Sequence, residues 1–340
     1  MKKCIELAKL AEGLTSPNPL VGCVVLDKNG KEIATGNHTK YGSNHAERDA
    51  LLKIEPGQGH TLIVNLEPCS HHGKTPPCAD FIIKMGIKRV IIGMLDPNPI
   101  VSGRGVEKLK NAGIDVQIGI CKDECENLNE VFIKNMIQEK VFVAIKTATT
   151  LDGKIATSTG SSKWITSDNA RNEVKKIRNR YDAIMTSSST ITADQPTMAH
   201  RKKIILDRNL KTDLNTPIYK EGDIYIFNSQ YNKNENNLHF IKTPTSNDKL
   251  DLDFILSHVY KIGIRSILVE SGGYLNGEML KYADKIYHFI APKITGDNTA
   301  LSCFNYQQIS NINESKNFKI DNVQMFPPDV LITYKPMYKN

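Results

Sequence analysis

Two cysteines, two histidines and a lysine lie close together in the stretch NLEPCSHHGKTPPCAD, residues 65–80. A disulfide between Cys69 and Cys78 is disfavoured, because seven unevenly spaced cysteines do not resemble a secreted disulfide framework. A phosphate-binding loop is excluded, because Pro68 stands where the motif ending in GKT requires a glycine. The two thiols therefore favour a metal site, of which they would provide half of a tetrahedral ligand set.

The missing ligand is expected upstream in NHAERDALL, where His45 stands at the start of a predicted helix and Glu47 follows two residues later. H-x-E followed by P-C and a second cysteine is the pattern of zinc-dependent nucleobase deaminases. One imidazole and two thiolates hold Zn²⁺ and leave a fourth position for water, whose pKa the metal lowers. Glu47 is then placed to carry a proton from that water to the ring nitrogen and the departing ammonia.

The gap between the two cysteines is eight residues in this sequence, whereas two residues are usual. His71 and His72 lie in this gap and are alternative ligands in principle. We expect neither to bind the metal, because His45, Cys69 and Cys78 already complete a three-ligand set and a fourth protein ligand would block the water. Cys78 also stands at a predicted helix start, where the helix dipole favours a thiolate.

The elements that must position these residues alternate between strands and helices up to about residue 120. Apolar runs rich in β-branched residues predict strands at NPLVGCVVLD, TLIVNL and RVIIGML, and helical patterns cover HAERDALLKI and CADFIIKMG. Gly86 is expected to end the second helix. The charged segment 122–140 is expected to be helical and to separate two domains. Cys121, just before it, and Cys125 within it are expected to serve packing only.

A second alternating series begins at residue 141. Strands are predicted in YDAIMTSSSTI, KKIILD, DIYIFN, RSILVESGG, KIYHFIAPKI and DVLITYKP, with helices near 168–181 and 251–262. The Asn-rich stretch 229–240 is expected to be a surface loop. No fixed-period repeat relates the two halves, so we expect two different α/β domains rather than a duplication.

Composition fits this division. The chain has 340 residues, of which 40% are apolar and 24% charged, an ordinary globular balance with two domains as the natural expectation. No apolar run reaches membrane-spanning length, and charged residues interrupt the N-terminal segment, so a cytoplasmic protein is expected. The net charge of +7 suits phosphorylated small molecules as well as nucleic acid and does not choose between them.

The long cysteine gap, together with TSPNPLVGCVVL, HTKYGSNHAE and DPNPIVSGRG, resembles the bifunctional riboflavin-biosynthesis enzymes, which fuse a pyrimidine deaminase to an NADPH-dependent reductase. The resemblance covers nearly the whole chain. It implies a cytidine-deaminase-like α/β/α domain at 1–140, a dihydrofolate-reductase-like α/β domain at 141–340, and Zn²⁺ and NADPH as cofactors. The implied reactions are hydrolytic deamination of 2,5-diamino-6-ribosylamino-4(3H)-pyrimidinone 5′-phosphate, then reduction of the ribosyl group of 5-amino-6-(5-phosphoribosylamino)uracil to ribityl.

The same resemblance implies site residues in both halves. Those expected to line the deaminase substrate pocket are Asn18, His38, Lys74, Asp96 and Asn98. Those expected to contact the substrate of the reductase are Ser162, Arg178, Met198, Arg201 and Glu270. Those expected to contact NADPH are Ala148, Trp164, Thr190, Asp194, Arg208, Gly272, Gly273, Tyr274, Leu275, Asn276, Gly277 and Glu278. The alternative for SPNP and DPNP is that they only form turns.

Residue chemistry supports part of this assignment. SILVESGGYLNGEML is a strand that runs into glycines and then a helix, so bare amides at a helix N-terminus can hold phosphate. Arg178 and Arg201 suit a clamp on the sugar phosphate. Lys146 and Glu270 are expected to be catalytic, relaying the proton that accompanies hydride delivery to ribose C1′. The alternative for Lys146 is an edge-strand lysine that reaches solvent.

Two other functions fit the sequence less well. A tRNA- or DNA-editing deaminase would need clustered Lys and Arg interleaved with aromatics, and the sequence has no such cluster. A structural zinc module would need four protein ligands, whereas this pattern offers three and a carboxylate. We therefore expect a phosphorylated pyrimidine substrate, no nucleic-acid or membrane partner, and a homo-oligomer.

Overall fold

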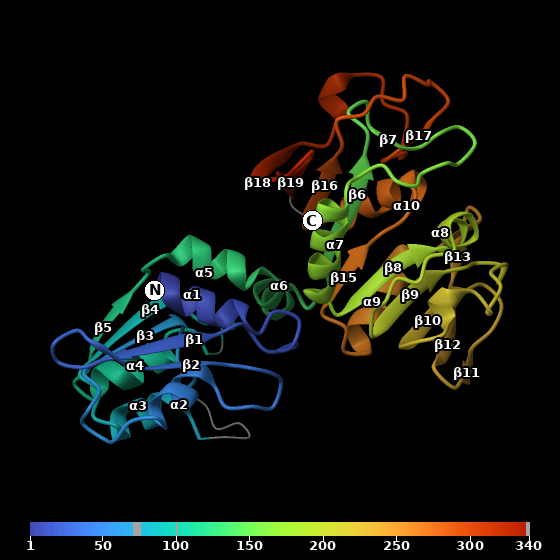
Figure 1. Cartoon of the computed structure of the whole chain (residues 1–340). Coiled ribbons are helices and arrows are strands. Elements are labelled where there is room, and N and C mark those ends of the chain that lie inside the picture. Colours follow the sequence, from blue (N-terminus) through green and yellow to red (C-terminus); the bar gives the residue numbers. More distant parts are fainter. Residues whose placement is uncertain (71–75, 100, 338–340) are drawn as a thin grey trace. The chain divides into compact units, whose positions relative to one another are not determined.

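The computed structural model describes residues 1–70, 76–99 and 101–337 of the chain (Figure 1). The chain divides into two compact units, Met1–Glu139 and Lys140–Asn340. Among the described residues, no helix combines the length and the apolar composition needed to cross a membrane.

The first unit is a five-stranded sheet in the order β2-β1-β3-β4-β5, in which β1 runs antiparallel to both neighbours and β3, β4 and β5 are parallel. Its elements are α1 (Lys2–Lys9), β1 (Gly22–Leu26), β2 (Glu32–Asn37), α2 (Ala46–Leu51), β3 (Thr61–Leu66), α3 (Cys78–Lys84), β4 (Arg89–Met94), α4 (Arg104–Asn111), β5 (Asp115–Ile118), α5 (Lys122–Leu128) and α6 (Glu130–Gln138).

Helices cover both faces of this sheet. A Cβ atom on Gly22 would lie 2.0 Å from the Cys4 carbonyl oxygen, so α1 packs directly on β1. A Cβ atom on Gly36 would lie 2.3 Å from the Ala46 carbonyl oxygen, so α2 packs as closely on β2. Since Gly22 pairs with Asn37 and alternate residues face opposite ways, these two helices lie on opposite sides of the sheet, as Figure 1 shows. The layers are the expected α/β/α arrangement.

The second unit is a ten-stranded sheet in the order β11-β12-β10-β9-β8-β15-β6-β16-β19-β18. Its elements are β6 (Phe142–Thr149), β7 (Lys154–Ala156), α7 (Asp168–Asn179), β8 (Ala183–Ser187), α8 (Ser188–Asp194), β9 (Lys202–Leu206), η1 (Pro217–Tyr219), β10 (Asp223–Asn228), β11 (Lys233–Glu235), β12 (Leu238–Lys242), β13 (Thr245–Ser246), β14 (Lys249–Leu250), α9 (Leu252–Lys261), β15 (Ser266–Val269), α10 (Gly273–Met279), η2 (Leu280–Tyr282), β16 (Lys285–Ile290), β17 (Leu301–Ser302), η3 (Ile312–Glu314), β18 (Phe318–Phe326) and β19 (Asp329–Pro336).

The middle of this sheet, from β12 to β16, is parallel, and both ends are antiparallel. The parallel strands are buried on both faces, which explains their nearly continuous apolar runs. Alternation along β6 places Val143 and Ile145 in a core with residues of α9 and α10. Lys146 and Ala148 follow the opposite alternation.

One expectation about this unit was wrong, and one alternative interpretation is excluded. The stretch 229–240 is not simply a surface loop, because β11 and the first residues of β12 lie within it and add to the sheet edge. The Asn-rich composition suits only the turn, where Asn236 adopts a φ of 53°, while Phe240 is buried. The alternative interpretation of Lys146 as an edge-strand lysine is excluded, since β6 lies between β15 and β16.

Candidate active sites

Three elements of the first unit bring one imidazole and two thiols together. His45 directly precedes α2, Cys69 follows β3 in a loop, and Cys78 opens α3. The candidate ligand atoms of these three residues all lie within 4.8 Å of one another. The distance from His45 Nδ1 is 3.3 Å to the Cys78 sulfur and 3.6 Å to the Cys69 sulfur. One nitrogen and two sulfurs at this spacing fit Zn²⁺ with one position left open.

The electrostatics around the two sulfurs favour a thiolate. A hydrogen bond from the Cys78 thiol lowers the pKa of Cys69, burial opposes this, and a hydrogen bond from His45 adds to the lowering, so that the pKa of Cys69 lies well below its ordinary value. The backbone N–H of Cys78, at the first turn of α3, donates to the Cys69 sulfur at 3.3 Å. The pair therefore carries negative charge near neutral pH, which is the form that binds a metal.

Glu47 lies in the first turn of α2 and is only 4% exposed. Burial raises the pKa of its carboxyl group to about 7, with a smaller contribution from the charge of Cys69. A carboxyl group with this pKa both accepts and gives up a proton near neutral pH, as a general acid–base requires.

Buried His38 and half-buried Asn18 form a polar pair next to His45. The rings of His38 and His45 are 5.8 Å apart. Burial lowers the pKa of His38, so its ring is neutral and carries one proton. The ring Nδ1 faces the Asn44 carbonyl oxygen at 2.9 Å and must donate to it, which leaves Nε2 as an acceptor. The Asn18 amide nitrogen at 3.1 Å therefore donates to Nε2, and its carbonyl oxygen remains for another partner.

Three further residues were predicted to line this pocket, namely Lys74, Asp96 and Asn98, and the structure describes only the last two. Lys74 lies outside the described residues, as do His71 and His72, so their predicted roles stay predictions. Asp96 Oδ1 accepts a hydrogen bond from the Asn98 amide at 2.8 Å, which is the turn geometry of the alternative interpretation of DPNP.

Sequence reasoning missed Glu67, which directly follows β3 and is 4% exposed. Glu67 stands in LEPC, residues 66–69, but the neighbouring residues do not indicate which groups its side chain contacts. In the structure its carboxylate accepts hydrogen bonds from the backbone N–H groups of Asp96, Gly103, Gly105 and Val106.

The second unit gathers three charged side chains near the carboxyl end of β15, one each from β6, α7 and the residue after β15. Glu270 directly follows β15 and is 5% exposed. Its carboxylate accepts two hydrogen bonds from Arg178, from Nε at 2.6 Å and from Nη2 at 3.0 Å. It also forms an ion pair with Lys146 Nζ at 3.0 Å. Burial alone would raise the pKa of Glu270, but the charges of Lys146 and Arg178 outweigh it and lower that pKa to about 2.

This geometry changes the expectation for Arg178. The sequence predicted a clamp on phosphate together with Arg201, but one edge of the Arg178 guanidinium is already bound to Glu270. Arg201 is exposed at the start of β9. The structure therefore joins Arg178, Lys146 and Glu270 and does not join Arg178 to Arg201.

A cluster of three hydroxyl groups lies where two neighbouring parallel strands end. Ser187 Oγ at the end of β8 is 2.8 Å from Ser271 Oγ, and Thr190 Oγ1 is 3.1 Å from the same atom. Thr190 also accepts from the Gly272 amide at 3.3 Å. The glycine-rich helix α10 starts at this point without a side-chain cap, so its first amides are open to an anion.

Gly273 and Gly277 permit a close approach of the chain to α10. A Cβ atom on Gly273 would lie 2.1 Å from the Ser302 carbonyl oxygen, and one on Gly277 would lie 2.4 Å from that of Asn305. Asn276 is buried between them and donates to the carbonyl oxygens of Ser271 and Cys303. These residues of the predicted cofactor turn therefore also hold the helix in place, while Tyr274 is exposed.

Trp164, the only tryptophan of the chain, is 63% exposed but held in place. The Arg171 guanidinium lies over its ring at 4.4 Å, and Lys293 donates to its carbonyl oxygen at 2.8 Å. Ser162 and Lys163, just before it, both donate to Asp194, the first to its carboxylate and the second to its carbonyl oxygen. The structure thus places Ser162 and Asp194 in contact beside Trp164, while their predicted contacts with substrate and NADPH stay predictions.

The remaining predicted residues have other partners. Met198 is 6% exposed and packs in an apolar cluster with Ile184 and Ile205, so a substrate contact by its side chain would need that cluster to open. Arg208 pairs with Asp248 at 2.8 Å. Glu278 pairs with Lys249 at 3.1 Å.

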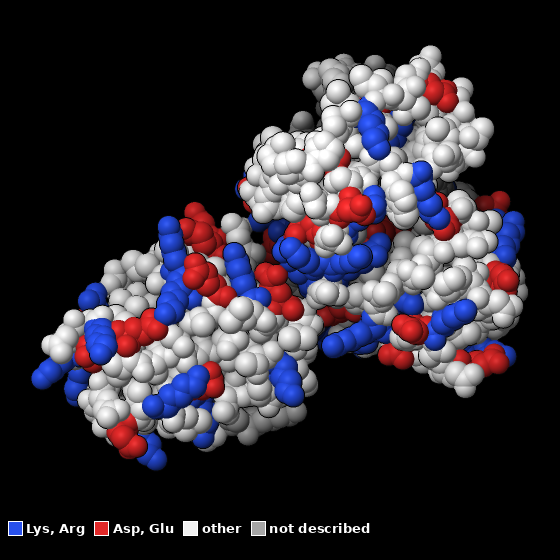
Figure 2. Space-filling view, viewed as in Figure 1, with Lys and Arg blue, Asp and Glu red and all other residues white. Residues whose placement is uncertain are grey.

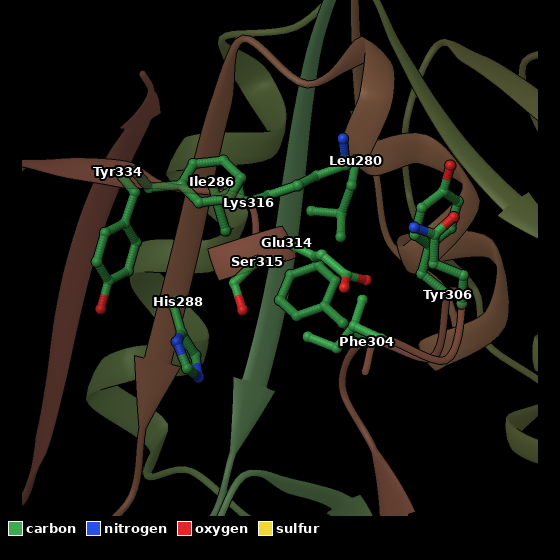
Figure 3. Close-up of a pocket in the computed structure, with 12 residues that line it drawn as sticks. Leu280, Ile286, His288, Phe304, Tyr306, Glu314, Ser315, Lys316 and Tyr334 are labelled. Atoms are coloured by element: carbon green, nitrogen blue, oxygen red, sulfur yellow. The ribbon is translucent and has the colours of Figure 1, made fainter. Parts of the chain in front are cut away.

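A cavity of about 420 Å³ lies elsewhere in the second unit, between β16, β19 and the segment 304–318 (Figure 3). Its walls are mainly apolar and aromatic, with His288 projecting from β16. Lys146 pairs in register with Tyr287, so His288 lies on the opposite face of the sheet. The cavity is therefore separate from the Lys146–Glu270 cluster.

Charge on the molecular surface is mixed. On the face shown in Figure 2, lysine and arginine side chains are interspersed with aspartate and glutamate over each unit. Nucleic-acid binding typically needs a stripe of one sign, so this face gives no support to the editing alternative.

Comparison with known families and structures agrees with both sites. Residues 1–94 match the cytidine and deoxycytidylate deaminase zinc-binding region, and residues 141–332 match the RibD C-terminal domain. The chain is 39% identical to the riboflavin biosynthesis protein RibD of Aquifex aeolicus, covering 98% of this chain and 97% of that protein. It is 34% identical to RibD of Escherichia coli, covering 98% and 97%.

Two solved structures cover nearly the whole chain. One is a diaminohydroxyphosphoribosylaminopyrimidine deaminase/5-amino-6-(5-phosphoribosylamino)uracil reductase from Thermotoga maritima, with a TM-score of 0.90, 40% identity, and coverage of 99% of this chain and 97% of that one. The other is RibD from Acinetobacter baumannii, with a TM-score of 0.87, 32% identity, and coverage of 99% and 98%. The chain therefore belongs to the RibD family and is a bifunctional riboflavin-biosynthesis enzyme, a zinc-dependent deaminase joined to an NADPH-dependent reductase.

Proposed function

We propose that residues 1–140 deaminate 2,5-diamino-6-ribosylamino-4(3H)-pyrimidinone 5′-phosphate and that residues 141–340 reduce the ribosyl group of the resulting 5-amino-6-(5-phosphoribosylamino)uracil. One observation carries the proposal. The chain contains both the His45–Cys69–Cys78 cluster and the Lys146–Glu270 pair, and it aligns over 99% of its length with the deaminase/reductase of Thermotoga maritima. That enzyme is named for a diaminopyrimidine deaminase and a 5-amino-6-(5-phosphoribosylamino)uracil reductase activity, from which both substrates are taken.

In the first reaction, His45, Cys69 and Cys78 would hold zinc. Bound zinc lowers the pKa of a water molecule so that it reacts at neutral pH. Glu47 takes one proton from that water and gives it to the ring nitrogen, and then carries the proton of the resulting hydroxyl group to the amino group, which leaves as ammonia while the carbonyl forms; its pKa of about 7 suits both transfers. Asn18, oriented by His38, offers a carbonyl oxygen to an N–H group on the pyrimidine edge.

In the second reaction, the open amides of α10 and the hydroxyl groups of Thr190 and Ser271 would hold the phosphates of NADPH. Bound NADPH supplies the hydride. Lys146, held by Glu270, would donate the accompanying proton to the sugar, and Arg201 would bind the substrate's phosphate. Arg178 keeps the Glu270 carboxylate ionised and fixed in place.

The test is incubation of the chain with the diaminopyrimidinone phosphate, followed by product identification by mass spectrometry. Without NADPH, we expect loss of one amino group as ammonia and accumulation of the uracil product. With NADPH, that product should gain two hydrogens. Reduction of the diamino compound before any ammonia is released would contradict the proposed order.

We also infer that two copies of the chain associate through β18. This strand is the edge of the ten-stranded sheet, and its side chains Ile320, Val323 and Met325 are between 53% and 67% exposed. A long exposed edge with apolar side chains is a template for pairing, and two identical edges pair symmetrically. Light scattering should give twice the chain mass for the wild type and less for Val323→Pro, whereas a monomeric wild type would contradict the inference.

A further inference from the structure

The carboxylate of Glu67 is buried, bears no catalytic assignment and joins two segments of the deaminase site. Its Oε2 atom accepts from the amides of Asp96 at 3.1 Å and Gly103 at 3.0 Å. Its Oε1 atom accepts from Gly105 at 2.9 Å and Val106 at 3.2 Å. Both oxygens are thus bound to backbone donors from a segment that lies 29 to 39 residues away.

The start of α4 explains why these donors need an outside partner. The helix is preceded by Gly103 in a left-handed conformation with a φ of 82°, and glycine has no side chain to cap the first turn. Glu67 supplies the missing acceptors from the end of β3, and its charge suits the positive end of the helix. Gly105 makes the approach possible, because a Cβ atom there would lie 2.1 Å from the Pro68 carbonyl oxygen.

The same carboxylate fixes the turn that precedes α4. The Asp96 amide is bonded to Glu67, and the Asp96 side chain in turn accepts from the Asn98 amide. Glu67 is also two residues from Cys69 along the chain. The predicted substrate residues Asp96 and Asn98 are therefore tied to the loop that carries a predicted metal ligand.

From this geometry we propose that Glu67 is a positioning residue of the deaminase, which holds Asp96 and Asn98 in register with the metal-ligand loop. The inference rests on the proposed function, because Asp96 and Asn98 matter only if they bind the pyrimidine. The substitution Glu67→Gln would keep the shape of the side chain but present an NH₂ group to two amide donors, so two of the four hydrogen bonds would be lost.

The test measures both reactions of the full chain for Glu67→Gln and Glu67→Asp, together with zinc content. We expect Glu67→Gln to raise the Michaelis constant for the diaminopyrimidinone phosphate roughly ten- to a hundredfold, with zinc bound and the deaminase kcat nearly unchanged. Glu67→Asp, which keeps the charge, should lie between Glu67→Gln and wild type. Far-UV circular dichroism and thermal unfolding of each variant, compared with wild type, report whether the first unit is folded, because the reductase activity reports only on the second unit.

A matched control is Asp27→Asn, because Asp27 also accepts from two backbone amides, but in the exposed turn between β1 and β2. This variant should leave both reactions unchanged. An unchanged Michaelis constant in Glu67→Gln would overturn the proposal, and so would loss of zinc in both Glu67 variants, since Glu67 would then hold the metal ligand. If Glu67→Gln does not fold, Glu67→Asp decides by the same criteria. Failure of the wild type to deaminate this substrate would instead refute the proposed function.

Discussion

Replacement of Glu270 by glutamine should weaken the second unit by an amount that depends on pH. The pKa of Glu270 falls from an ordinary 4.5 to about 2, because Lys146 and Arg178 outweigh the effect of burial. At 1.36 kcal/mol per pKa unit, this difference corresponds to about 3 kcal/mol of folding free energy. Because the folded-state pKa is the lower one, the stabilisation is complete above pH ~4.5 and is lost as the pH falls through ~2.

The difference in unfolding free energy between wild type and Glu270→Gln should therefore be about 3 kcal/mol at pH 7 and roughly half of that at pH 3. A glutamine is neutral at every pH. Protonation of Glu270 in the wild type removes the negative charge that the variant lacks at every pH, so the difference in unfolding free energy shrinks. Urea unfolding followed by tryptophan fluorescence suits the measurement, because Trp164 is the only tryptophan and lies in this unit.

A control variant with an exposed carboxylate is Glu235→Gln on the edge strand β11. Glu235 pairs with Lys233 at 2.6 Å, but both side chains are more than half exposed. An exposed pair of this kind contributes about 0–1 kcal/mol, so this variant should stay near wild type at every pH. A loss in Glu270→Gln that is the same at pH 7 and pH 3 would refute the charge argument and leave only a packing effect.

Three further predictions concern the reactions. Glu47→Gln should keep zinc, measured by metal analysis, but lose deamination by several orders of magnitude, and near-wild-type turnover would exclude the proton transfer. Arg201→Ala should raise the Michaelis constant for the phosphorylated uracil roughly ten- to a hundredfold in steady-state assays. Weaker NADPH binding with an unchanged Michaelis constant would assign Arg201 to the cofactor. A fragment ending at Glu139 should deaminate without NADPH, and one starting at Lys140 should reduce; a folded, zinc-loaded first fragment without activity would contradict independent sites.

Much of the fold could be predicted because its strands are apolar runs or alternate between apolar and polar residues. The run TLIVNL coincides with β3, and DVLITYKP coincides with β19. The stretch 229–240 could not be predicted in the same way, because its polar composition is typical of a loop. Its strands form by pairing with each other and with β10, a partner that short-range patterns do not reveal.

The candidate deaminase ligands were accessible to sequence reasoning because metal chemistry restricts residue types and spacing. The partners of the second site were not, because Arg178 and Glu270 are 92 residues apart and meet only when α7 packs near the end of β15. Arg178 was therefore predicted to bind phosphate, although the structure pairs it with a carboxylate. An isolated arginine is compatible with both, and only the fold decides between them.

Glu67 and Glu270 show where local sequence stops being informative. Each is the first residue after a buried parallel strand, in TLIVNLE and in SILVE, and each is about 95% buried. A buried carboxylate must be compensated, and the two sites do this differently. Glu67 accepts four backbone N–H groups from the start of α4 and the turn before it, whereas Glu270 faces two cationic side chains. In our proposals, the first arrangement positions a loop of the deaminase site, and the second holds the lysine that donates a proton to the sugar. The residues that make this difference lie far along the chain, so the same local pattern supports a positioning role in one domain and a catalytic role in the other.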